Sequence, residues 1–154
     1  MDKGIYCLVF KNPGCTVRVG ALGEIAFRPG WHCYVGSALG SGGLKRLERH
    51  IRLSALRDKR PKWHVDYLHT SSCFSLAYAV YAVTDERLEC PLARELGDGG
   101  VQKFGCSDCT CPFHLFYWKR DPKREILSAF RHLGLTPSTT TIMNPSVQDS
   151  IWTC

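Results

Sequence analysis

The sequence predicts an α/β (α+β) fold. We expect a small, central, mainly antiparallel three-stranded sheet flanked by helices, with a peripheral hairpin and a C-terminal helix added to it. Three short stretches are apolar enough to be buried strands: residues 4–10, 31–38 and 76–83. Three other stretches repeat apolar residues at helical spacing: residues 44–53, 88–96 and 121–133. The 154 residues suit one domain with a real core.

The strand predictions follow from alternation. Residues 4–10 are apolar in both alternating rows, which is typical of a strand covered on both faces. Residues 16–20 and 24–27 are half-polar and flank a turn, so they predict the peripheral hairpin. In residues 31–38, Tyr34 falls in the row opposite Cys33 and Val35.

The first predicted helix carries most of the basic character. Arg46 and His50 are four positions apart and share a face beside the apolar stripe. A separate outer face holds Lys45, Arg49 and Arg52. Residues 62–68 favour a short helix, and residues 115–118 an edge strand. Two helices follow the basic one: Gly97 ends the helix at 88–96, and the helix at 121–133 starts with a cap at Asp121.

Composition limits the compartment and the partners. Lys and Arg outnumber Asp and Glu by 20 to 14, a net charge of +6 that favours polyanionic partners. The N-terminus has no apolar signal segment, and no apolar run is long enough to span a bilayer, so we expect a cytoplasmic protein without a membrane partner. In a reducing compartment the nine cysteines favour buried thiols or a metal site over disulfides. Core thiols are expected in apolar surroundings: Cys7, Cys33, Cys73 and Cys90.

The tripeptides Gly4-Ile5-Tyr6 and Tyr34-Val35-Gly36 resemble the two halves of the GIY-YIG nuclease signature. In that superfamily the second half precedes a helix with an Arg, often with a His one turn later, and a later helix begins with a Glu. Arg46, His50 and Glu89 match those positions. The chain also resembles a small stand-alone subgroup over roughly residues 4–118, including Trp63-His64-Val65-Asp66-Tyr67.

The resemblance implies a domain organisation and an activity. Residues 1–118 would form a GIY-YIG nuclease-like domain with a Cys-rich knuckle at 105–114. The rest of the chain lies outside the resemblance, and its residue pattern predicts a helix packed on the domain over residues 119–136 and a loose tail over residues 137–154. The activity would be a metal-dependent DNA endonuclease using one Mg²⁺ or Mn²⁺ ion, a tyrosine-assisted mechanism and little sequence specificity. The DNA substrate is branched or damaged in this view, and a protein partner supplies specificity.

The resemblance also assigns roles. Glu89 would hold the ion, Arg46 would meet the scissile phosphate with its planar fork of donors, and Tyr6 would deprotonate the attacking water. Tyr34 and His50 would position water or phosphate, or shuttle protons. Nucleic-acid contacts would come from residues near this site: Ser37, Lys45, Arg49, Arg52 and His64.

Each of these residues has a structural alternative. The two tyrosines can be ordinary sheet aromatics, and Arg46 with His50 can be a solvated helix face. Glu89 can be an N-terminal helix cap, which leaves Glu86 and Glu95 as other carboxylates for a metal. The functional alternative is a non-catalytic nucleic-acid-binding module that keeps the fold.

The Cys-rich knuckle offers four soft ligands within nine residues: Cys106, Cys109, Cys111 and His114. Zinc sites use similar spacings, so a structural Zn²⁺ is one interpretation, and it would make the chain a zinc-stabilised protein-interaction module. A turn of buried thiols is a second interpretation. In a third, His114 lies at the edge of the active site.

Overall fold

The computed structural model describes residues 2–97, 99–102, 104 and 113–142. Its centre is a six-stranded sheet in the order β6-β7-β4-β1-β5-β8, and each described strand pairing is antiparallel. The strands are β1 (Gly4–Asn12), β4 (Gly30–Ala38), β5 (Ser75–Val83), β6 (Gly100–Gln102), β7 (Phe113–Trp118) and β8 (Ser138–Thr141). The predicted class is confirmed, and the three expected strands are the middle of the sheet, β4-β1-β5.

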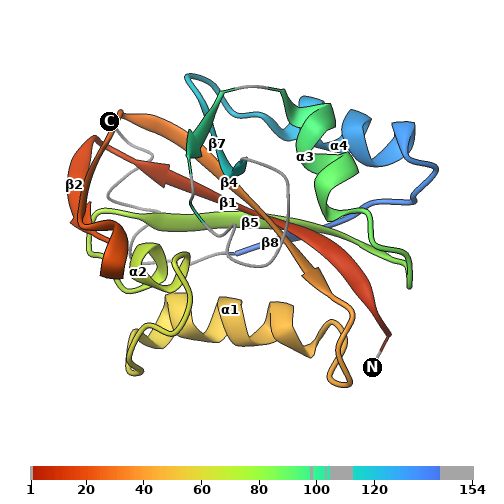
Figure 1. Cartoon of the computed structure of the whole chain (residues 1–154), viewed down its shortest axis with the longest axis horizontal. Coiled ribbons are helices and arrows are strands. Elements are labelled where there is room, and N and C mark those ends of the chain that lie inside the picture. The colour runs from red at the N-terminus through yellow and green to blue at the C-terminus, as the bar shows by residue number, and fades with distance from the viewer. Residues whose placement is uncertain (1, 98, 103, 105–112, 143–154) are drawn as a thin grey trace.

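Helices cover both faces of the sheet (Figure 1). On one face lie α1 (Lys45–Leu56) and α2 (Asp66–His69), and on the other lie α3 (Glu89–Leu96) and α4 (Lys123–His132). The alternation of β1 explains the two layers. Leu8 and Phe10 pack in the core beneath α1 and α2, whereas Cys7 and Val9 pack beneath α3 and α4.

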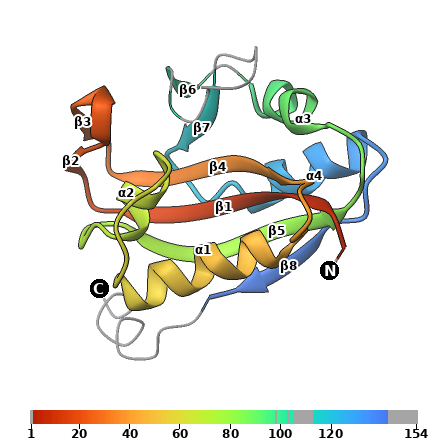
Figure 2. The ribbon, with the colours of Figure 1, turned by 60° about the horizontal axis from the view of Figure 1, so that its bottom comes forward.

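The peripheral hairpin forms as predicted. β2 (Cys15–Arg18) and β3 (Glu24–Phe27) make a separate two-stranded sheet, joined through the 3₁₀ turn η1 (Gly20–Leu22). Figure 2 shows the hairpin standing beyond the end of the main sheet. A disulfide between Cys15 and Cys73 ties β2 to the segment before β5.

The cysteine prediction is therefore wrong in part. Cys7 and Cys33 are buried free thiols, as expected. Cys73, expected as a core thiol, is bonded to Cys15, and Cys90 is half-buried and also disulfide-bonded. Apolar neighbours in sequence predicted burial but carried no information about which sulfur atoms meet.

Two predictions about the sheet edges are also corrected. β7 is not an edge strand, because it lies between β4 and β6. The segment expected to begin a loose tail instead forms β8, which pairs with β5 along the opposite edge; residues 143–154 lie outside the described part. Polar Thr139, Thr140 and Thr141 suit an edge strand that is mostly exposed.

The helix predictions differ mainly at their boundaries. The helix expected over 62–68 is the single turn α2, which starts at Asp66. The cap position of α4 is Pro122, one residue after the expected Asp121, which still accepts a hydrogen bond from the Lys123 backbone N–H at 3.1 Å. α4 packs Ile126 and Phe130 into the core, as a helix packed on the domain should. No helix among the described residues is long and apolar enough to cross a membrane.

Candidate functional site

Tyr6 and Tyr34 lie on the sheet face that α1 covers. Tyr6 is paired with Gly36 across β1 and β4, so Tyr34, two residues before Gly36, is its diagonal neighbour on the same face. A Cβ atom on Gly36 would fall 2.6–2.7 Å from the Tyr6 ring and hydroxyl. The glycine in the second tripeptide therefore makes room for the tyrosine in the first.

The start of α1 is packed against the start of β1. A Cβ atom on Gly4 would meet the Ala82 carbonyl oxygen at 2.5 Å and the Leu44 side chain at 2.9 Å. The Leu44 backbone N–H also donates to the Asp2 carbonyl oxygen at 2.7 Å. These contacts fix the helix beside the two tyrosines.

Arg46 and His50 take different positions on α1. Arg46 is exposed; its Nη1 donates to the Ser37 carbonyl oxygen at 3.0 Å, and its guanidinium lies 5.1 Å from the Trp63 ring. His50 is 1% exposed, and its Nε2 lies 2.9 Å from the Tyr6 hydroxyl. The alternative of a solvated Arg46–His50 face is thus wrong for His50.

Glu89 is the first residue of α3 and lies near the tyrosines. Its Oε1 is 3.9 Å from Nε2 of His114, and the His114 ring is 6.4 Å from the Tyr34 ring. The cap position is Leu88, and no side chain caps the helix, so Glu89 is not the cap. The spare carboxylate of Glu95 instead bonds His132 at 3.2 Å.

The environment of Tyr6 connects these residues electrostatically. Burial raises the pKa of Tyr6 well above its ordinary value, and nearby Tyr34 and Glu89 raise it further, whereas Arg46 lowers it. The contacts agree with this: Arg46 reaches the Ser37 carbonyl oxygen in β4, and His114 lies beside both Glu89 and Tyr34, the diagonal neighbour of Tyr6. Residues from four separate elements therefore lie in one region: Tyr6, Tyr34, Arg46 and Glu89.

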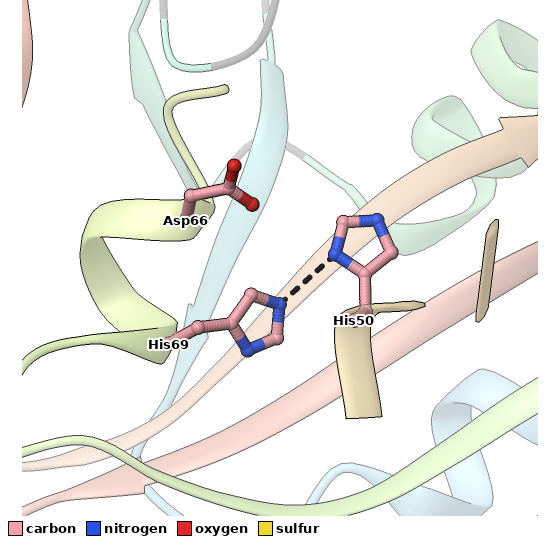
Figure 3. A group of neighbouring side chains, drawn as sticks. All are labelled: His50, Asp66 and His69. Carbon is pink, nitrogen blue, oxygen red and sulfur yellow. Dashed lines mark hydrogen bonds between the residues drawn. The ribbon is translucent and has the colours of Figure 1, made fainter. Parts of the chain in front are cut away.

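A buried network beside Tyr6 was missed by sequence reasoning. His50 Nδ1 lies 3.0 Å from His69 Nε2, and the Asp66 carboxylate is close to both rings (Figure 3). Burial lowers the pKa of His50 to about 3 and that of His69 to about 4, so both rings are neutral near pH 7. Asp66 and His69 are three positions apart, which places them on one face of α2, and that spacing was the available signal.

Asp66 is held by a set of hydrogen bonds. Arg49 donates to its two carboxylate oxygens at 3.3 and 3.0 Å, and the backbone N–H groups of Lys62 and Trp63 donate at 2.8 and 3.1 Å. Desolvation raises the pKa of Asp66, but these bonds outweigh it and lower the pKa overall. Asp66 is therefore an ionised, buried anchor for the loop before α2.

One cluster of residues and one separate carboxylate offer metal ligands. His50, Asp66 and His69 place three ligand atoms within 4.8 Å of one another. Arg49 already neutralises Asp66, however, so a divalent ion would leave two positive charges buried among neutral rings, which is costly. The Glu89 carboxylate is 23% exposed and has no ion pair with Lys or Arg among the described residues, which suits Mg²⁺ with its own waters.

The expected nucleic-acid contacts are only partly available. Lys45 and Arg52 are exposed on α1, as predicted. Arg49 was expected to share that face, but it turns to Asp66 and lies 4.2 Å from the Trp63 ring, because a buried carboxylate lies within its reach. Ser37 offers its carbonyl oxygen to Arg46. His64 is half-buried, with its ring 5.5 Å from Phe104.

The predicted zinc ligands lie mostly outside the described residues. This applies to Cys106, Cys109 and Cys111. The fourth, His114, is 2% exposed and lies beside Glu89 and Tyr34. Its position agrees with the alternative in which His114 lies at the edge of the tyrosine–glutamate site.

Comparison with known proteins adds one finding. The model of the family described as "Domain of unknown function DUF123" matches residues 5–135, which include each residue of the candidate site. No curated protein and no solved structure matches the chain.

Proposed function

Because the chain belongs to the DUF123 family, whose description names no activity, we propose its function from its own residues. We propose a metal-dependent endonuclease that hydrolyses DNA phosphodiester bonds with low sequence specificity, as the resemblance to GIY-YIG nucleases implies. The alternative is a nucleic-acid-binding module without catalysis.

One observation carries the proposal. The exposed Arg46 guanidinium bonds the Ser37 carbonyl oxygen in β4, and the Glu89 carboxylate lies 3.9 Å from His114, whose ring neighbours Tyr34. A carboxylate and a guanidinium thus flank the two tyrosines. Phosphodiester hydrolysis needs both kinds of group, a carboxylate for a cation and a cation for the phosphoryl oxygens. An ordinary sheet tyrosine needs neither, so this convergence favours a site.

The chain's own residues divide the work. Glu89 is the residue that would hold Mg²⁺ or Mn²⁺, which when bound would polarise the phosphoryl group. Arg46, held in place by the Ser37 carbonyl and Trp63, presents its remaining donors to the phosphate. Tyr6 and Tyr34 position the attacking water, and His50 orients the Tyr6 hydroxyl through their hydrogen bond.

Low sequence specificity follows from the contacts that are available. The exposed cations Lys45 and Arg52 of α1 suit phosphate groups, which carry no sequence information. A partner protein or a distorted DNA structure would then direct cleavage.

The test is cleavage of plain, nicked and branched duplex DNA with Mg²⁺ or Mn²⁺. We expect cleavage by the wild type and a loss of at least about a hundredfold in Glu89→Gln and Arg46→Ala. Glu86→Gln is the matched control, because Glu86 is an exposed carboxylate three positions before Glu89.

The outcomes separate the two functions. Equal cleavage by wild type and Glu89→Gln would mean a contaminating nuclease, and the proposal would fail. Salt-sensitive DNA binding that survives Glu89→Gln, with no cleavage of any substrate, would establish the binding module instead.

A further inference from the structure

Three buried side chains form a hydrogen-bonded row that ends at the candidate site. His69 Nε2 lies 3.0 Å from His50 Nδ1, and His50 Nε2 lies 2.9 Å from the Tyr6 hydroxyl. Their exposed fractions are 0%, 1% and 2%. Because both imidazoles are neutral, each ring carries one proton, and the position of that proton decides the direction of each hydrogen bond.

His69, the residue of the row farthest from Tyr6, determines the direction of both hydrogen bonds. His69 Nδ1 is buried and has no hydrogen-bond partner among the described residues. A proton on this atom would create a buried N–H group without an acceptor, which folded proteins rarely tolerate. The proton therefore belongs on His69 Nε2, which must donate to His50 Nδ1.

The direction then passes along the row. His50 Nδ1 is the acceptor, so the single proton of His50 lies on Nε2 and is donated to the Tyr6 oxygen. The Tyr6 oxygen accepts this bond, and its own proton is free to be donated elsewhere. Glu89 is the described carboxylate whose charge acts on this phenol.

We propose that His69 is a positioning residue that holds His50 in its Nε2–H tautomer, so that Tyr6 offers its phenolic proton to an oxygen acceptor in the candidate site. No described residue other than His50 lies within hydrogen-bond distance of the Tyr6 hydroxyl, so the acceptor is a water molecule or a phosphate oxygen of the substrate. The direction of the bonds is a property of the free protein, and its use in cleavage rests on the proposed function.

The proposal changes the role of His50. With Nε2 already protonated, His50 cannot take the proton of Tyr6, so it is not a proton shuttle for that residue. Its N–H instead stabilises negative charge on the phenol oxygen. Any proton that leaves Tyr6 goes to an acceptor other than His50.

The direct test is nuclear magnetic resonance of the full chain labelled with ¹⁵N-histidine. Long-range ¹H–¹⁵N correlations near pH 7 distinguish the two tautomers of each ring, and His50→Gln and His69→Gln assign the signals. We expect the Nε2–H pattern for both His50 and His69. An Nδ1–H pattern for His50 would overturn the proposal.

Two variants at His69 separate positioning from packing. Gln can still donate to His50 Nδ1, so His69→Gln should keep the His50 Nε2–H tautomer. Leu cannot donate, so His69→Leu should release His50 into a mixture of tautomers. If His69→Leu does not fold, the wild type and His69→Gln still decide the question, because loss of the Nε2–H pattern in His69→Gln would contradict it.

Cleavage kinetics then test the use of the row. His69→Leu should lower kcat on the order of tenfold or more with an unchanged KM for DNA, and His69→Gln should retain wild-type kcat within about twofold. If no protein cleaves DNA, the proposed function fails while the tautomer result stands. If the wild type cleaves DNA and His50 is Nδ1–H, the positioning role fails alone.

Discussion

Tyr6 and Gly36 are direct partners across β1 and β4, and a Cβ atom on Gly36 would lie 2.6 Å from Cζ of the Tyr6 ring. Real Cβ atoms do not approach a ring so closely, and Tyr6 is too buried to move aside easily. Gly36 of the second tripeptide therefore both pairs with Tyr6 of the first tripeptide and leaves the space that the Tyr6 ring occupies.

Gly36→Ala should lower the free energy of unfolding by about 1–3 kcal/mol, because it overpacks the core. Gly42→Ala is the matched control, since nothing lies within 4 Å of its Cβ position. Urea denaturation measures both changes. Equal stability of Gly36→Ala and wild type would show that the ring moves freely.

The stability should fall steeply once the pH drops below about 6.5. Burial lowers the pKa of three histidines in the folded chain to about 4 for His32, about 3 for His50 and about 4 for His69. Between those values and 6.5 the unfolded state binds more protons, so each histidine removes about 1.4 kcal/mol per pH unit as the pH falls. Urea denaturation from pH 7 to 5 measures the slope.

The slope has its own controls. His32→Gln should reduce it, because the variant lacks one of the three rings whose pKa is lowered to about 3 or 4. His132→Gln changes an exposed side chain and should reproduce the wild-type dependence. A stability that stays flat from pH 7 to 5 would contradict the burial of the histidines.

Asp66→Asn should lower the free energy of unfolding by about 3–5 kcal/mol, because it leaves the Arg49 guanidinium without its carboxylate partner. Arg49→Met should cost a similar amount, and the double variant less than the sum of the two. Glu95→Gln, in the exposed pair with His132, should change stability by less than about 0.5 kcal/mol. Additive losses in the cycle would mean that Arg49 and Asp66 do not interact.

Removal of the disulfide should lower stability by about 2–4 kcal/mol, since the bond between Cys15 and Cys73 closes a loop with a sequence separation of 58. Cys15→Ser with Cys73→Ser, compared with the wild type under oxidising conditions, measures the loss by urea denaturation. Dithiothreitol should destabilise the double variant less than the wild type, because the Cys15–Cys73 bond is already absent and the disulfide of Cys90 remains to be reduced. Equal stability of the two proteins would indicate that the bond does not form in solution.

DNA binding should depend on salt through the exposed cations of α1. Lys45→Gln with Arg52→Gln should reduce the magnitude of the slope of log K against log[salt] by up to about 2, since each phosphate contact contributes about 1. Fluorescence anisotropy with plain duplex DNA measures the slope. Lys123→Gln with Arg124→Gln, on the opposite helical layer, is the control. An equal reduction of the slope in both double variants would indicate that the net charge of the protein, and not the α1 face, controls DNA binding.

The sequence predicted the elements that depend on local pattern. β1, β4 and β5 alternate or are continuously apolar, and they form the middle of the sheet; their order, β4-β1-β5, was not predicted. The proximity of Glu89 to Tyr6 was also expected, but only through the resemblance, because nothing local to either residue indicates the other.

The remaining features depend on contacts between distant segments. A helical wheel placed Arg49 on an outer face but cannot show that Asp66 lies within its reach. The partner of Cys73 was not predictable for the same reason, since sequence gives the number of cysteines and not their connectivity. β8 was missed because a run of threonines acquires its strand character by pairing with the exposed edge of β5.

The order of the site along the chain has a consequence for synthesis. Tyr6, Tyr34 and Arg46 leave the ribosome before β5 and Glu89 do. Since β1 lies between β4 and β5, a nascent chain that stops before β5 has one open edge on its central strand. Such a chain carries the cationic part of the site without the acidic part. On the proposed function, the emerging polypeptide already has the guanidinium that would meet a phosphate, but it lacks the carboxylate that cleavage would require until α3 is in place.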